Sequence, residues 1–126
     1  EDKENFDLLK RVYKALKKSG KFLLDIENIH YLINNLPKER WEKKEGMYIL
    51  EKNKINLKTS RLKTERIFIK NRNAYEYIRN YRIYSFSEIK NYLEEADFKI
   101  INCYGGYEKE ELNLFSKRLV IVSEKS

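Results

Sequence analysis

The chain has 126 residues, of which 41% are hydrophobic and 37% are charged, so it suits one globular domain and excludes a disordered segment. Cys103 is the only cysteine and no apolar run has the length of a membrane span, which excludes a disulfide framework and a membrane partner and favours a reducing, cytoplasmic location. The formal net charge is +7, but basic residues are scattered among acidic ones, which favours a solvated lysine-rich surface over a dedicated nucleic-acid face.

The stretch from Glu1 to Leu16 is predicted to be an amphipathic helix. Its apolar side chains recur at helical spacing and form one stripe of Phe6, Leu9, Val12, Tyr13 and Leu16. Acidic residues crowd the start of this helix and lysines occupy its last turn, as the helix dipole favours. Gly20 is expected in the left-handed conformation that ends many helices.

The next segment, Lys21–Ile26, is predicted to be a strand buried on both faces, because apolar side chains lie on both sides of it. Asp25 is near the carboxyl end of this strand, and Asn28, His30 and Tyr31 follow it. Ligands bind at the carboxyl ends of strands in open α/β sheets. The sequence therefore predicts a binding site at this end of the strand.

A short helix and an antiparallel β insert are predicted to follow. Ile29, Leu32, Ile33 and Leu36 lie on one side of the helix, and Pro37 ends it. Residues 46–84 alternate apolar and polar side chains in the segments MYILEK, INLK, RLKTERIFIK and AYEYIRNYRIY, which turn residues separate. This alternation is typical of a meander with one face in water.

The last part of the chain predicts a helix and two strands. Ser85 and Glu88 have the spacing of a capping box at the start of a helix. Strands are expected at Phe98–Tyr104 and Leu119–Ser123, on either side of a polar loop that contains Gly105 and Gly106. The predicted fold class is therefore α/β, with a β insert.

Three of these segments resemble the class I S-adenosylmethionine-dependent methyltransferases. The stretch VYKALKKSGKFLLDI resembles their fifth strand and the helix before it, where a Leu-Lys-Pro-Gly-Gly-like turn is replaced here by Leu16–Gly20. Ala96, Asp97 and Phe98 are similar to the Ala-Gly-Phe pattern before the sixth strand, with Asp in place of Gly. The stretch RLVIVSEK resembles the antiparallel seventh strand.

The resemblance implies that residues 1–126 are one domain, the C-terminal half of a Rossmann-like methyltransferase sheet that holds the fifth to seventh strands. The Lys21–Ile26 strand should then pair antiparallel with the last strand, and Phe98–Tyr104 should flank the last strand on its other side. The missing N-terminal half is the expected partner. The free edge of the Lys21–Ile26 strand also predicts a homodimer.

The complete protein is expected to transfer a methyl group from S-adenosylmethionine to an N or O acceptor, either a small molecule or a nucleic acid. The family holds this cofactor through a Gly-rich turn and an acidic residue in its first half, and neither pattern is present in this chain. The chain alone is therefore expected to be inactive and to bind the cofactor poorly. No catalytic residue and no metal site is assigned.

The resemblance places the acceptor between the end of the Lys21–Ile26 strand and the insert. The candidate substrate-binding residues are Asp25, Asn28, His30, Tyr31, Trp41, Arg82 and Tyr84. Helix capping, surface exposure and packing under the insert are the structural alternatives for these residues.

Two other functions stay open. The tyrosines and arginines between Tyr77 and Tyr84 suit either cross-strand packing or a stacking platform for single-stranded nucleic acid. The second alternative is that the chain is a structural subunit that completes a split methyltransferase.

Overall fold

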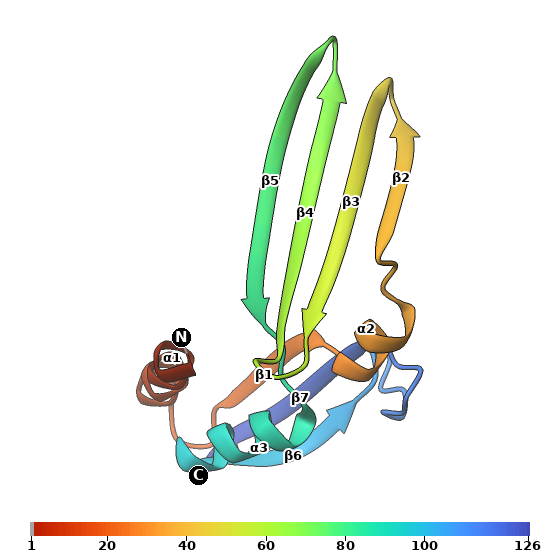
Figure 1. The fold of residues 1–126 in the computed structure, drawn as a ribbon. Coiled ribbons are helices and arrows are strands. Elements are labelled where there is room, and N and C mark those ends of the chain that lie inside the picture. The colour runs from red at the N-terminus through yellow and green to blue at the C-terminus, as the bar shows by residue number, and fades with distance from the viewer. Residues whose placement is uncertain (1) are drawn as a thin grey trace. The chain divides into compact units, whose positions relative to one another are not determined.

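A computed structural model describes residues 2–126 of the chain. The chain divides into two compact units, one made of the residues up to Leu32 together with Tyr84–Ser126, and the other of Ile33–Ile83 (Figure 1). We call these the first unit and the second unit.

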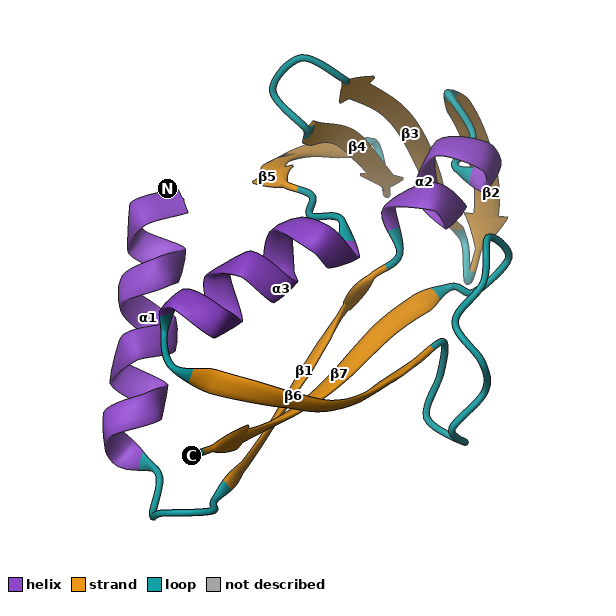
Figure 2. Ribbon diagram, turned by 90° about the horizontal axis from the view of Figure 1, so that it is seen from below, coloured by secondary structure: helices purple, strands orange, loops and turns teal. Residues whose placement is uncertain are grey.

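The first unit is built on a three-stranded sheet with the order β1-β7-β6. Its strands are β1 (Lys21–Glu27), β6 (Phe98–Tyr104) and β7 (Arg118–Lys125), and β7 is antiparallel to both neighbours. Helix α1 (Asp2–Ala15) precedes β1, and α3 (Phe86–Glu95) precedes β6 (Figure 2). The predicted pairing of the first strand with the last, and the place of Phe98–Tyr104 on the other side, are confirmed.

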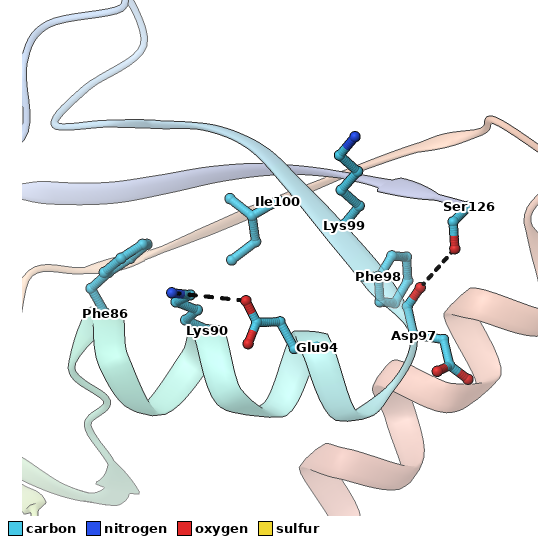
Figure 3. Close-up of a pocket in the computed structure, with 8 residues that line it drawn as sticks. All are labelled: Phe86, Lys90, Glu94, Asp97, Phe98, Lys99, Ile100 and Ser126. Carbon is cyan, nitrogen blue, oxygen red and sulfur yellow. Dashed lines mark hydrogen bonds and ion pairs between the residues drawn. The ribbon is translucent and has the colours of Figure 1, made fainter.

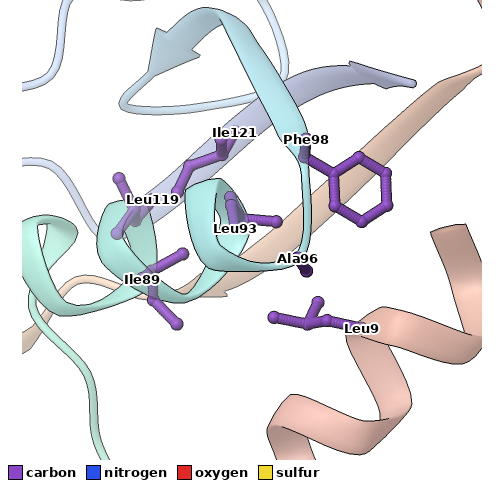
Figure 4. Packing of buried hydrophobic residues seen from close by; sticks show 7 residues of the cluster. All are labelled: Leu9, Ile89, Leu93, Ala96, Phe98, Leu119 and Ile121. Atoms are coloured by element: carbon purple, nitrogen blue, oxygen red, sulfur yellow. The ribbon is translucent and has the colours of Figure 1, made fainter. Parts of the chain in front are cut away.

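The core of the first unit lies between its helices and one face of the sheet. Leu9 of α1 and Leu93 of α3 meet Phe98 and Ile121 of the strands there. The complete buried cluster in Figure 4 is Leu9, Ile89, Leu93, Ala96, Phe98, Leu119 and Ile121. The apolar stripes read from the two helical segments therefore form this core.

The second face of the sheet is covered at β7, where Val120 is buried, but exposed at β1. Leu23 of β1 is 58% exposed, whereas Phe22 and Leu24 point the other way and pack against the core. The prediction that this strand is buried on both faces is therefore wrong for this chain. The reason is that α1 and α3 both contribute to the core on the opposite face.

The turn between α1 and β1 also differs from the prediction. Ser19, with a φ of 64°, is the residue in the left-handed conformation, not Gly20. Gly20 is nonetheless required, because a Cβ atom there would lie 2.7 Å from the carbonyl oxygen of Lys17. The glycine thus allows a close backbone approach.

The start of α3 has the predicted capping box. The Ser85 hydroxyl accepts a hydrogen bond from the backbone N–H of Glu88, and the Glu88 carboxylate accepts one from the backbone N–H of Ser85. Asp97, where the methyltransferase pattern has glycine, takes the left-handed conformation with a φ of 69°. This residue connects α3 directly to β6.

The second unit is an antiparallel meander with the strand order β2-β3-β4-β5. Its strands are β2 (Glu39–Lys44), β3 (Met47–Asn56), β4 (Arg61–Lys70) and β5 (Asn73–Arg82), and the short helix α2 (Ile29–Asn35) precedes them. The meander was predicted, but β2 was not, and two predicted segments are the single strand β3. The sequence of β2, ERWEKK, is too charged to read as a strand alone.

Candidate functional site

The carboxyl end of β1 carries a polar cluster that belongs wholly to the first unit. The Asp25 carboxylate accepts a hydrogen bond from Arg118 Nε at 2.9 Å and another from the Tyr107 hydroxyl. Burial raises the pKa of Asp25, but these two hydrogen bonds and the charge of Arg118 outweigh it, so the pKa is lowered overall. Asp25 is therefore ionised and paired at neutral pH.

Asn28 connects the end of β1 to the loop between β6 and β7. Its side-chain amide donates to the carbonyl oxygens of Asn113 at 3.2 Å and of Ser116 at 2.8 Å, and its side-chain oxygen accepts from the backbone N–H of His30. Asn28 is only 5% exposed. The hydrogen-bonding groups of this side chain are therefore used to position the loop and to start α2.

The loop from Gly105 to Lys117 forms the outer wall of this site. A Cβ atom on Gly105 would lie 2.3 Å from Ser116 Oγ, so the loop closes on itself only with glycine there. The loop residues and Arg118 line a cavity of about 420 Å³, and Phe115 on its wall is 84% exposed. The loop thus brings an aromatic surface and a paired charge to the carboxyl end of β1.

His30 and Tyr31 lie in the first turn of α2, beyond the end of β1. His30 is exposed and Tyr31 is half-buried. Together with Asp25 and Asn28 they make four of the predicted site residues that the first unit gathers at one strand end. Their role in substrate binding stays a prediction.

Tyr84 has a different environment in the first unit. Its hydroxyl accepts a hydrogen bond from the Asn5 side chain at 2.7 Å and donates one to Asp2 at 2.8 Å. Its ring stands edge-on to Tyr92, with the centroids 6.0 Å apart. Tyr84 therefore connects α1 to the start of α3.

Trp41 and Arg82 belong to the second unit. Trp41 lies on β2, where its ring centroid is 6.4 Å from that of Tyr48. Tyr77 and Tyr81 share one face of β5 with Arg79, which lies 4.1 Å above the Tyr81 ring. Strand alternation puts Arg82 on the opposite face, so the predicted set of tyrosines and arginines does not make one platform.

Sequence reasoning missed a buried carboxylate in the second unit. Glu51 of β3 accepts hydrogen bonds from Arg40 Nε at 2.9 Å, Arg66 Nε at 2.5 Å and the Asn53 side chain at 2.9 Å. Burial raises the pKa of Glu51, but these three donors lower it to about 2 overall. The sequence did contain a signal for this cluster. Glu51 and Asn53 are two positions apart in the segment that forms β3, which puts their polar side chains on the same face.

A further cavity, of about 550 Å³, lies between α3 and β6 (Figure 3). Its polar contacts are the ion pair of Lys90 with Glu94 and the hydrogen bond from Ser126 Oγ to the Asp97 carbonyl oxygen. None of the predicted site residues lines this cavity. Cys103, further along β6, is a half-buried thiol whose pKa is raised by burial, which argues against a nucleophilic role.

Within residues 2–126 no group of three or more His, Cys, Asp or Glu side chains has an arrangement that would hold a metal ion. In the same range, no helix has the length and apolar character needed to cross a membrane.

Comparison with known proteins gives structural matches alone. No protein-family model matches the chain, and no curated protein matches it. The chain is similar to an S-adenosylmethionine-dependent methyltransferase from Clostridium acetobutylicum, with a TM-score of 0.85 and 15% identity over 98% of this chain and 52% of that one. It is equally similar to the CcbJ methyltransferase from Streptomyces caelestis, with a TM-score of 0.85 and 15% identity over 98% of this chain and 54% of that one.

A more distant match is an amino pentose methyltransferase from Micromonospora echinaspora, solved with S-adenosylmethionine bound. Its TM-score is 0.56 and its identity 9%, over 96% of this chain and 50% of that one. The chain spans about half the length of each of these structures. The chain thus shares the fold of about half of each of these methyltransferase structures.

Proposed function

We propose that this chain is the acceptor-side portion of an S-adenosylmethionine-dependent methyltransferase that modifies an N or O atom. The observation that carries the proposal is the structural match over 98% of the chain at a TM-score of 0.85. The polar cluster at the end of β1 supports it, because ligands bind at the carboxyl ends of strands in such sheets. Methyl transfer depends mainly on alignment of the reactants, which a fixed cluster and a loop held by hydrogen bonds provide.

The residues of this chain do not fit a complete cofactor site. Gly20 lies between α1 and β1, Gly46 lies between β2 and β3, and Gly105 and Gly106 follow β6. None of them stands between a strand and the helix that follows it, where a nucleotide-binding turn needs glycine. Cofactor binding is therefore assigned to the missing half, and the acceptor to this one.

The acceptor is proposed to contact Asp25 and the loop that carries Phe115. Asp25 offers a charged group already oriented by Arg118, which suits an acceptor with an amine or hydroxyl group. His30, exposed in the first turn of α2, is the candidate base for the proton that the acceptor loses. Amino sugars are a reasonable first acceptor class to test, because one similar structure is an amino pentose methyltransferase.

The test begins with the coding sequence upstream of Glu1, which we expect to encode a strand, a Gly-rich turn and a helix. The longer protein should then transfer labelled methyl groups from S-adenosylmethionine to an amine or hydroxyl acceptor. Asp25→Asn and His30→Ala should lower turnover while the cofactor affinity changes little, and Lys99→Ala on β6 is the matched surface control. A loss of cofactor affinity in both variants, with acceptor kinetics intact, would show that the two sides of the site are reversed.

A nucleic-acid-binding function is a second candidate, favoured by one observation on β5. Tyr75 and Tyr77 are exposed on the same face of this strand, with Arg79 beside them. Exposed aromatic side chains next to arginine suit base stacking. Binding of a single-stranded oligonucleotide that weakens with salt and with Tyr77→Ala would support this function, and binding that is absent at low salt would remove it.

A further inference from the structure

We infer that a cavity beside α2 in the second unit binds a small organic anion with an apolar tail, of the fatty-acid class. The cavity has a volume of about 450 Å³, and all of its lining residues belong to the second unit. They come from the end of α2, the link to β2, the start of β2, the last part of β3 and the turn after it. Small-molecule sites are mostly apolar hollows of about 300–1,000 Å³ with a few polar groups that orient the ligand. We call this hollow the α2 cavity.

The apolar part of the α2 cavity suits an alkyl chain. Ile33 of α2 and Leu36 after it line the cavity, together with Ile55 of β3 and Leu57 of the following turn. Ile33 is 46% exposed and Leu57 is 73% exposed, so both are accessible to a ligand. An alkyl chain in the cavity would remove this apolar surface from water, which favours binding.

The charged side chains of the α2 cavity are mainly positive. Three lysines line it, Lys38, Lys52 and Lys54, with one carboxylate, Glu39. Glu39 stands directly opposite Lys52 on the paired strands, whereas the residue opposite Lys54 is another lysine, Lys63. In the described part of the chain neither Lys38 nor Lys54 forms an ion pair. These two ammonium groups are therefore available to an anionic head group.

The edge of β3 adds a backbone donor to the α2 cavity. The ladder between β2 and β3 ends at the pair of Glu39 with Lys52, and the backbone N–H of Asn53 donates to the Lys38 carbonyl oxygen at 2.8 Å. Residues two apart in a strand direct their N–H groups to the same side, so the N–H of Ile55 points to this side too, past the start of β2. Among residues 2–126 it has no hydrogen-bond acceptor. An anionic oxygen in the cavity can accept from it.

These groups select an anion with an apolar tail over other ligands of an apolar hollow. A neutral hydrocarbon would leave the Ile55 N–H and both lysines without a partner, and an organic cation would be repelled by Lys38 and Lys54. The Asn53 side chain, which also lines the cavity, is already hydrogen-bonded within the second unit. The selectivity is thus assigned to the lysines and the backbone N–H.

The experiment is isothermal titration calorimetry of the 126-residue chain with dodecanoate, at concentrations below those at which dodecanoate forms micelles. We expect one site per chain with a dissociation constant below about 100 μM. Octanoate should bind about tenfold more weakly or less, because it buries fewer methylene groups. Dodecyltrimethylammonium, which has the same tail and the opposite charge, should not bind.

Substitutions at exposed positions locate the site. Lys54→Glu should raise the dissociation constant of dodecanoate by about tenfold or more, and Lys70→Glu, at the exposed end of β4, is the matched control. Leu57→Asp should have a similar effect, and Leu114→Asp, a similarly exposed leucine in a turn of the first unit, is its control. Both controls should leave the dissociation constant unchanged. Circular dichroism verifies that each variant is folded.

Three results would overturn the inference. The chain does not bind dodecanoate, it binds dodecyltrimethylammonium equally well, or its affinity for dodecanoate is unchanged in Lys54→Glu and Leu57→Asp. Loss of binding in a longer protein that includes residues upstream of Glu1 would also overturn it, because another part of the protein would then fill the cavity. None of these titrations uses S-adenosylmethionine or methyl transfer, so their outcome is separate from that of the proposed function.

Discussion

Replacing Glu51 by glutamine tests how much the buried carboxylate stabilises the second unit. The Glu51 side chain is 4% exposed, and it holds Arg40 from β2 and Arg66 from β4 against β3. Glutamine keeps the shape of the side chain and its hydrogen bond with Asn53 but removes the negative charge. The two arginines keep side chains that are 37% and 42% exposed, so water solvates them in the variant.

The size of the effect follows from the pKa of Glu51. Its ordinary value is 4.5 and its value in the folded chain is about 2, because the hydrogen bonds from Arg40, Asn53 and Arg66 outweigh the opposing effect of burial. A shift of one pKa unit corresponds to about 1.4 kcal/mol, so the charged form adds about 3 kcal/mol to the free energy of unfolding. Since the folded pKa is depressed, this stabilisation is complete above pH 4.5 and is lost as the pH falls toward 2.

The assay is urea unfolding followed by tryptophan fluorescence, since Trp41 is the only tryptophan and lies on β2 beside Arg40. Glu51→Gln should lower the free energy of unfolding by about 3 kcal/mol at pH 7, and the difference from the unsubstituted chain should shrink between pH 4.5 and pH 2. Glu45→Gln, which removes an exposed carboxylate in the turn between β2 and β3, is the control and should change little. A difference that stays constant over this pH range would refute the reasoning.

Two further predictions concern the first unit. Asn28→Ala should cost about 1–3 kcal/mol and speed hydrogen exchange in the Gly105–Lys117 loop, because it removes both donors to the loop carbonyls; unchanged exchange would mean that the loop holds itself. Asp97→Gly should raise the midpoint of thermal unfolding, since a left-handed residue with a Cβ atom costs about 1–2 kcal/mol. Asp97→Ala is the control and should not raise it.

Most of the first unit could be predicted from local patterns in the sequence. Phe6, Leu9 and Val12 at helical spacing predicted α1, and Ser85 with Glu88 predicted the start of α3, because each signal depends on residues close together in the chain. The exposure of Leu23 could not be read this way. An apolar strand residue has the same sequence signal whether or not the other face of its sheet is covered.

The second unit shows a different limit. Strand β2 forms because Arg40 pairs with Glu51 and Trp41 with Leu50, and these partners give a charged segment a strand conformation that its own sequence does not favour. The polarity of the two faces was also unpredictable, since alternation fixes which residues share a face but not which face meets water.

The candidate site was predicted in part. Asp25 and Asn28 were identified because they lie at the end of an obvious strand. Tyr107 and Arg118 were not, because they are 82 and 93 residues from Asp25 in the chain and meet it only through the fold. The loop was predicted only as a polar connection, although its glycines and aromatic residues were visible in the sequence.

The central position of β7 also determines the order in which the chain assembles during synthesis. Phe22 of β1 and Ser123 of β7 are 101 residues apart, so β1 has no ladder partner among the described strands until the ribosome has released β7. The meander of the second unit pairs only neighbouring strands, and its closure requires no residue beyond Ile83. A nascent chain that stalls before Arg118 therefore has a complete insert but lacks the β7 partner of β1, which is the state that a chaperone or a protease would meet.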